Sequence, residues 1–229
     1  MIFRQVSPPS GPLLGFLVRP LCVFLLAASG CAAKPPPPVP EPSNTDDQPP
    51  LVQKKEKKKP CEAMSEGCIA SGDTQAKIPG SDFVFIPPTG WGFAQESGQT
   101  LAKAKEGPAA LAVTGYDPGT PVEEAKTRNL LLPRLAQSIG ISLPEKKKKT
   151  FVPLWDKPDD KQKFGDTEFE LWQADDAKQV DRAGPLLVFT TKDSSGKKIL
   201  GLAFSQKGDD KTVEVIMKVL QTFGPGSYQ

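Results

Sequence analysis

The chain has 229 residues with 29 Lys and Arg against 27 Asp and Glu, and this formal net charge of +2 gives no sign of a nucleic-acid partner. It contains no histidine, which excludes Ser-His-Asp and Cys-His catalytic sites and any zinc site built on imidazole. The phosphate-binding patterns GxxxxGK[ST] and GxGxxG and the nucleophile motif GxSxG are also missing.

The N-terminus carries the features of an export signal. Arg4 and Arg19 supply positive charge, Leu21–Ala28 form a short apolar region, and small residues lead to Cys31. This order resembles the lipobox of bacterial lipoproteins, in which a peptidase cleaves before a cysteine that then carries acyl chains such as palmitate. The resemblance implies a signal peptide over residues 1–30 and lipidation at Cys31. An ordinary cleaved signal and a retained helix remain alternatives, although the apolar run is shorter than the about 20 residues that span a bilayer.

Residues 31–60 contain the lipidated cysteine and a linker rich in Pro and Lys. Prolines remove backbone donors and the charged part has little to bury, so we expect a disordered tether that lifts the next domain off a membrane. The lysines between 54 and 59 can attract anionic lipid or cell wall. We favour the alternative of a solvated charged linker.

A cysteine pair follows the linker, within residues 61–74. Cys22 leaves with the signal peptide and Cys31 is acylated, so Cys61 and Cys68 remain in an oxidising compartment. We therefore predict a disulfide bond between them. Two free thiols, or part of a metal site, are the alternatives, and a zinc site would need ligands that a chain without histidine does not offer.

Residues 75–229 are long enough for one domain with its own core. The apolar run Phe83–Ile86 predicts a strand that ends at a double proline, and a turn then presents Trp91. Ala109–Tyr116 predicts a buried strand.

A helix is predicted from Pro121 to near Gly140. Thr120 and Glu123 form a capping box, and proline at the first helical position is favourable there. Pro133 removes a backbone donor in the middle of this segment, so we expect it to kink or split the helix.

Strand patterns dominate the second half of the domain. The predicted strands are Lys149–Leu154, Thr167–Trp172, Leu186–Thr191 and Ile199–Ser205. The turn residues Asp193–Gly196 join the last two as an antiparallel hairpin. Apolar residues at helical spacing predict a closing helix from about Asp209 to Phe223.

This order predicts an α+β fold in which a single antiparallel sheet is covered by helices, an α/β/α sandwich. The opening DFVFIPPTGW, the strand and helix near Pro121, the late hairpin and the closing VLQTFG resemble the PsbP-like family, which includes bacterial lipoproteins of the DcrB type. The resemblance spans most of residues 80–224. The resemblance implies the sandwich fold. It also implies a role in binding or assembly, because most members of that family act in this way.

Two groups of side chains are candidate ligand sites. The first is an acidic loop that offers oxygen ligands for calcium but lacks the EF-hand spacing, so a solvated loop is favoured; its members are Asp156, Asp159, Asp160 and Asp166. The second is Trp91, Trp155 and Trp172, our candidates for a binding surface, with packing in the core as the alternative.

We therefore expect a lipid-anchored bacterial envelope protein that is not an enzyme and needs no cofactor or metal. Ala32, in place of Asp, after the lipidated cysteine suggests the outer membrane, facing the periplasm. The main hypothesis is a domain that binds a protein partner or assists assembly. The alternative is a carrier or sensor of a small hydrophobic or sugar-like ligand. A deep apolar pocket near the tryptophans would favour the carrier, and a shallow exposed patch would favour the partner.

Overall fold

The structure is a computed structural model that describes residues 61–146 and 149–226. The described chain has an α+β fold with two helices, α1 (Pro121–Ser138) and α2 (Asp210–Leu220), and strands that all pair antiparallel. This class agrees with the sequence prediction. The strands are β1 (Ala76–Lys77), β2 (Phe83–Phe85), β3 (Gly92–Glu96), β4 (Gln99–Lys103), β5 (Ala110–Tyr116), β6 (Ile141–Ser142), β7 (Glu145–Lys146), β8 (Lys149–Thr150), β9 (Asp160–Phe164), β10 (Thr167–Gln179), β11 (Arg182–Lys192), β12 (Lys198–Phe204) and β13 (Gly224–Pro225).

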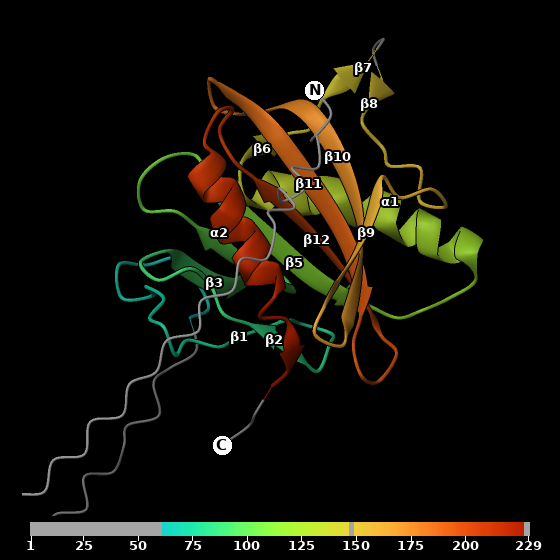
Figure 1. Cartoon of the computed structure of the whole chain (residues 1–229), viewed down its shortest axis with the longest axis horizontal. Coiled ribbons are helices and arrows are strands. Elements are labelled where there is room, and N and C mark those ends of the chain that lie inside the picture. Colours follow the sequence, from blue (N-terminus) through green and yellow to red (C-terminus); the bar gives the residue numbers. More distant parts are fainter. Residues whose placement is uncertain (1–60, 147–148, 227–229) are drawn as a thin grey trace, which may run out of the picture. The chain divides into compact units, whose positions relative to one another are not determined.

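The main sheet has eight strands and runs in the order β3-β4-β5-β12-β11-β10 (Figure 1). Beyond β10, β9 pairs with the first part of that strand and β6 with its end. Two smaller sheets accompany it, β1-β2-β13 and the hairpin β7-β8. The described chain therefore has three sheets, and the expected single sheet is not confirmed. Pro87 and Pro88 follow β2 closely and supply no backbone donor, so this strand ends after three residues.

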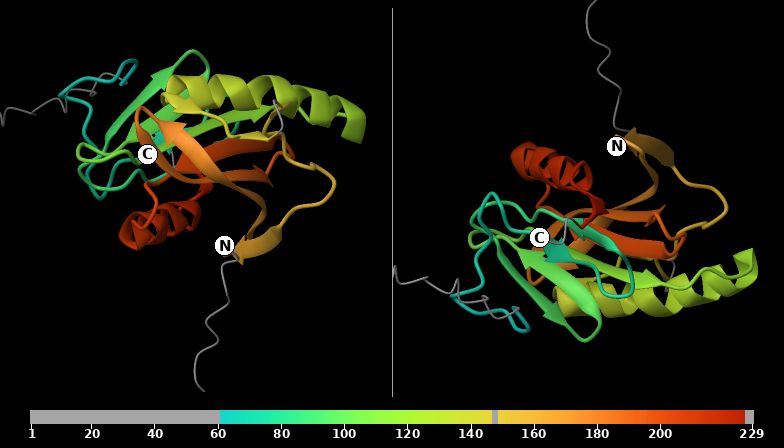
Figure 2. Two further views of the ribbon diagram at one scale, coloured as in Figure 1. Left: turned by 90° about the horizontal axis from the view of Figure 1, so that it is seen from above. Right: turned by 90° about the horizontal axis from the view of Figure 1, so that it is seen from below.

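The two helices lie on opposite faces of the main sheet (Figure 2). Alternation along β5 explains this, because Ala112 packs with Leu135 of α1 on one face and Leu111 packs with Leu220 of α2 on the other. Each face therefore has its own core, here called the α1-side core and the α2-side core. Both cores are formed by fully buried aliphatic and aromatic side chains.

Helix α1 begins with the predicted capping box. The hydroxyl of Thr120 accepts from the N–H of Glu123, and the Glu123 carboxylate accepts from the N–H of Thr120 (2.9 Å). The helix continues through Pro133, contrary to the expected split. Pro133 lies on the exposed face, while Leu132 and Leu135 on either side of it are buried against the sheet and hold both halves of the helix.

The strand predicted over Lys149–Leu154 is correct only at its start. β8 ends at Thr150, and residues 151–159 run as an irregular segment to β9. Pro153 and Pro158 lack the N–H that a continuous strand ladder requires, which explains the early end. We call residues 151–159 the strap.

Candidate functional site

The predicted lipidation site, Cys31, and the linker up to residue 60 lie outside the described residues. In the part of the chain that is described, no helix is both long and apolar enough to cross a membrane. The candidates that the structure places are the cysteine pair, the tryptophans and the acidic loop.

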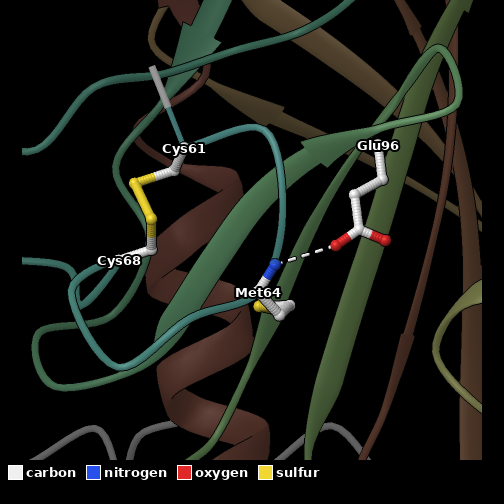
Figure 3. The surroundings of a disulfide bond; sticks show 4 residues. All are labelled: Cys61, Met64, Cys68 and Glu96. Carbon is white, nitrogen blue, oxygen red and sulfur yellow. Dashed lines mark hydrogen bonds between the residues drawn. A yellow bond between two sulfur atoms is a disulfide. The ribbon is translucent and has the colours of Figure 1, made fainter. Parts of the chain in front are cut away.

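Cys61 and Cys68 form the predicted disulfide bond, with their Cα atoms 5.7 Å apart (Figure 3). The carbonyl oxygen of Cys61 accepts a hydrogen bond from the N–H of Gln95 (2.7 Å), and that of Cys68 accepts from the N–H of Phe93 (2.9 Å). Both donors belong to β3, the outer strand of the main sheet. The disulfide therefore holds residues 61–68 along an edge whose backbone groups these carbonyls satisfy.

A side-chain contact strengthens this edge. The backbone N–H of Met64 donates to the carboxylate of Glu96 at the end of β3 (2.9 Å; Figure 3). Further along, the N–H of Ala70 donates to the carbonyl oxygen of Trp91 (2.8 Å). The Cys-containing segment is thus bonded to the sheet along most of β3.

The three tryptophans do not share one surface. Trp91 packs against the α2-side core, whereas Trp155 and Trp172 belong to the α1 side. Trp172 is only 2% exposed, and its indole N–H donates to the carbonyl oxygen of Leu154 in the strap (2.8 Å). It is therefore a core residue, and of the three only Trp155 and Trp172 lie together.

Trp155 fastens the strap to α1. Its indole N–H donates to the side-chain oxygen of Asn129 (2.6 Å), and its ring meets Trp172 edge-on with ring centroids 5.1 Å apart. Half-buried Phe151 also packs against the α1-side core. The strap is consequently a fixed part of the surface around the first half of α1.

Beneath the strap lies a buried arginine. Arg128 is 6% exposed; its Nε donates to the Tyr116 hydroxyl (2.7 Å) and its Nη2 to the Glu124 carboxylate (2.7 Å). The guanidinium carbon lies 5.3 Å from the centroid of the Trp155 ring, within cation–π range. Burial raises the pKa of Tyr116, and the hydrogen bond from Arg128 partly opposes this. The arginine is occupied by these partners and positions the strap, so it offers little to a ligand.

The outer side of this assembly carries large exposed apolar side chains. Of the six large hydrophobic residues that are exposed in the described chain, four lie on α1 or the strap. They are Val122, Leu130, Val152 and Leu154, and we call them the α1–strap surface. Leu130 is 66% exposed and Leu154 is 68% exposed. Leu130 follows Asn129 in the chain and Leu154 precedes Trp155, so both leucines flank the hydrogen bond that joins the strap to the helix. Large exposed apolar side chains on two joined elements are typical of a protein-binding surface.

Two hollows of about 350 and 500 Å³ border the second half of α1, and a third of about 620 Å³ lies just beyond its C-terminal end. None of these three is lined by a tryptophan. Trp172 is buried in the α1-side core, and half-buried Trp155 packs against that core.

The acidic loop is held by its own hydrogen bonds. The Asp159 carboxylate accepts from the backbone N–H of Gln173 (2.8 Å), and the Asp160 carboxylate accepts from the side chain of Gln162 (2.9 Å). Among the residues described here, no three His, Cys, Asp or Glu side chains are grouped so that they could hold a metal ion. The hydrogen bonds give these carboxylates a structural role in the strap and β9.

The sequence analysis missed the buried polar residues of this site. Glu124 and Arg128 stand four apart on a predicted helix, and this spacing is a recognisable ion-pair signal. The sequence did not indicate that these two side chains are shielded from solvent, because Trp155 of the irregular strap packs over Arg128.

Comparison with known proteins assigns no family. No protein-family model matches the chain, and no curated protein matches it.

Proposed function

We propose that this chain is a membrane-anchored lipoprotein of the bacterial envelope whose folded domain binds a protein partner and is not catalytic. The α1–strap surface is the observation that carries this proposal. It places leucines that are two-thirds exposed on a scaffold fixed by the Trp155–Asn129 hydrogen bond and by the aromatic contact beneath it. A rigid, exposed apolar surface loses little conformational freedom when a partner covers it.

The anchor and the compartment are supported by the cysteines. The lipobox pattern before Cys31 supports acylation there. The disulfide between Cys61 and Cys68 fits a compartment that oxidises thiols. The two helices lie on opposite faces of one large antiparallel sheet. This arrangement supports the finer proposal of an α/β/α sandwich of the PsbP-like kind.

The absence of catalysis is supported by chemistry. A chain without histidine lacks the side chain that most often transfers protons near neutral pH. Among the described carboxylates, that of Asp193 has its pKa lowered to about 2, and it is occupied by hydrogen bonds from the Ser81 hydroxyl and from the backbone N–H of Lys197. It lies outside the α1–strap surface.

The test uses the full-length protein in native envelope membranes. A photo-cross-linking amino acid replaces Leu154 in one variant and Val180 in the other, since Val180 is also highly exposed but lies at the β10–β11 turn. We expect a discrete protein adduct from position 154, lost when Leu130→Ser is added, and none from position 180. Equal adducts from both positions, or none from position 154, would refute partner binding at this surface.

One observation favours the alternative of a small-ligand carrier. The hollow of about 620 Å³ is lined by two cations, Lys103 and Arg182, by one carboxylate, Asp181, and by apolar groups such as Ile139, and this excess of positive charge suits a small anionic ligand. A panel of anionic sugars and fatty acids, tested by thermal shift with Lys103→Gln as the control, decides between the two functions. A shift that disappears in Lys103→Gln would support the carrier.

A further inference from the structure

The exposed crest of α1 alternates apolar and basic residues. Val122, Lys126, Leu130 and Arg134 are all exposed and stand four residues apart, so they form one stripe along the helix. The stripe passes through the α1–strap surface, to which Val122 and Leu130 belong.

The two cations of the stripe are not neutralised within the described residues. Arg128, Lys161, Lys197 and Lys198 each lie within ion-pair distance of a carboxylate, but neither Lys126 nor Arg134 does. The nearby carboxylate of Glu123 accepts from Thr120 in the capping box. Leu130 is therefore flanked on the helix by two positive charges that are available to another molecule.

A hollow lies beside one of these charges. It has a volume of about 350 Å³ and is formed by α1 and the turn between β3 and β4. Arg134 is the one charged residue in its lining, and the other lining residues are uncharged, such as Gln99 and Thr114. A carboxylate is the group that complements this lining best, because Arg binds carboxylates through paired N–H donors.

From these observations we infer that the segment bound at the α1–strap surface is an acidic peptide segment of the protein partner. This inference rests on the proposed function and names the chemistry of the partner. Lys126 and Arg134 are eight residues apart, which is about 12 Å along a helix. The matching segment carries an apolar side chain for Leu130 between two carboxylates about 12 Å apart. That spacing corresponds to about eight residues in a helix or four in an extended chain.

An anionic membrane surface is the competing occupant, and the charges around the site argue against it. The exposed carboxylates of Glu123 and Asp156 border the α1–strap surface and would face a uniformly negative plane. A peptide can place its charges opposite Lys126 and Arg134 and avoid these carboxylates. Charge complementarity of this kind chiefly sets specificity and association rate.

The experiment uses the full-length protein with the photo-cross-linking amino acid at position 154. It compares a charge-reversal variant with a matched control variant. Lys126→Glu with Arg134→Glu reverses the stripe. Lys207→Glu with Lys211→Glu changes the net charge equally at the start of α2, where both lysines are also exposed. We expect the stripe variant to lower the yield of the protein adduct about tenfold at low salt, and the control to leave it unchanged. Thermal unfolding of both variants verifies that each is folded.

Mass spectrometry of the adduct identifies the partner segment. An Asp- or Glu-bearing segment with the stated spacing, together with loss of yield on charge reversal, supports the inference. An unchanged yield in the stripe variant overturns the acidic partner but leaves partner binding standing, provided Leu130→Ser still abolishes the adduct. A lipid adduct that forms in vesicles of anionic phosphatidylglycerol but not in vesicles of zwitterionic phosphatidylethanolamine overturns the inference in favour of the anionic membrane. Absence of any adduct at position 154 refutes the proposed function itself.

Discussion

The carboxylate of Asp193 joins the β11–β12 turn to the segment that precedes β2. It is 5% exposed and accepts from the Ser81 hydroxyl (2.7 Å), the Ser195 hydroxyl (2.8 Å) and the backbone N–H of Lys197 (2.9 Å). Burial raises its pKa, but these hydrogen bonds and one from the N–H of Asp82 outweigh burial and lower the pKa to about 2. The sequence predicts a simple hairpin turn here, but the turn is also fixed by the hydrogen bond from Ser81, which lies 112 positions away.

Replacing this carboxylate should destabilise the protein in a pH-dependent way. Asp193→Asn keeps the shape but weakens hydrogen bonds to a charged acceptor, so we expect a loss of about 1–3 kcal/mol in the free energy of unfolding at pH 7. Because the folded pKa is below the ordinary value of 3.8, the advantage of Asp is present above pH 3.8 and is lost as the pH falls towards about 2. Urea unfolding of both proteins between pH 7 and pH 2 measures this difference, and a difference independent of pH would contradict the account.

For Tyr116 we expect the opposite pH dependence, a loss of stability at high pH. Burial raises its pKa above the ordinary value of 10.0, so the folded state favours the neutral phenol. Its contribution to stability is therefore present below pH 10 and is lost as the pH rises above that value. In Tyr116→Phe, the free energy of unfolding should therefore fall less steeply between pH 9 and 11. At pH 7 the substitution should cost about 1–3 kcal/mol, because the buried Arg128 loses a hydrogen-bond partner. A decline of equal steepness in the variant would show that other groups cause it.

At the scale of elements, the β11–β12 pair depends on a glycine beneath an aromatic ring. Gly201 pairs with Phe189 across the two strands, and a Cβ atom at position 201 would lie 2.2 Å from that ring. The ring is held by edge contacts to Phe169 and Phe223, with centroids 5.9 and 5.7 Å away, so it cannot simply move. The Phe189 ring therefore occupies the space that a side chain at position 201 would need.

We expect Gly201→Ala to lower the free energy of unfolding by about 1–3 kcal/mol through overpacking. Gly72→Ala is the control, because a Cβ there meets no atom within 4 Å. Chemical denaturation of the two variants provides the measurement. Similar stabilities would mean that the strands adjust to the added methyl group.

The disulfide also acts at this scale, through the edge of β3. Cys61→Ser with Cys68→Ser should cost about 2.5 kcal/mol by the loop-entropy estimate. In addition, the amide protons of Phe93 and Gln95 should exchange faster, because their acceptors lie in the segment that the disulfide holds. Hydrogen exchange resolved by residue tests this, with the amide of Leu111 in the central strand β5 as an internal reference. Unchanged exchange at Phe93 would show that the segment stays in place without the bond.

The elements that the sequence analysis identified correctly had a strong local signal. The capping box at Thr120 locates the start of α1, and the apolar runs locate β2 and β5. Strands β3 and β4 were missed because Gly92–Lys103 mixes polar and apolar residues without a continuous run. The Ser97-Gly98 turn between them, with φ angles of 50° and 77°, was the available signal. Their place in the sheet depends on long-range pairing with β5 and the Cys-containing segment, which no local pattern encodes.

At the scale of the whole molecule, the candidate site was only partly predictable. Alternation along β10 places Trp172 on the face opposite Phe169 and Leu171, so the sequence contained its separation from the α2-side core. Trp155 lies in the irregular strap, where no periodicity tells which element it meets. The α1–strap surface depends on that contact with Asn129 and therefore required the three-dimensional structure.

The proposed membrane anchor is tested at Cys31. Two or more acyl chains give stable membrane attachment, whereas one chain gives only reversible binding. Mass spectrometry of the native protein should find an acylated N-terminal peptide that begins at this cysteine. Cys31→Ser should release the protein from membranes, while Cys22→Ser should not, because residue 22 belongs to the predicted signal peptide. In a host with two membranes, Ala32→Asp should move the protein from the outer to the inner membrane in density fractionation. An intact Met1 terminus, or a free thiol at Cys31, would remove the anchor from the proposed function.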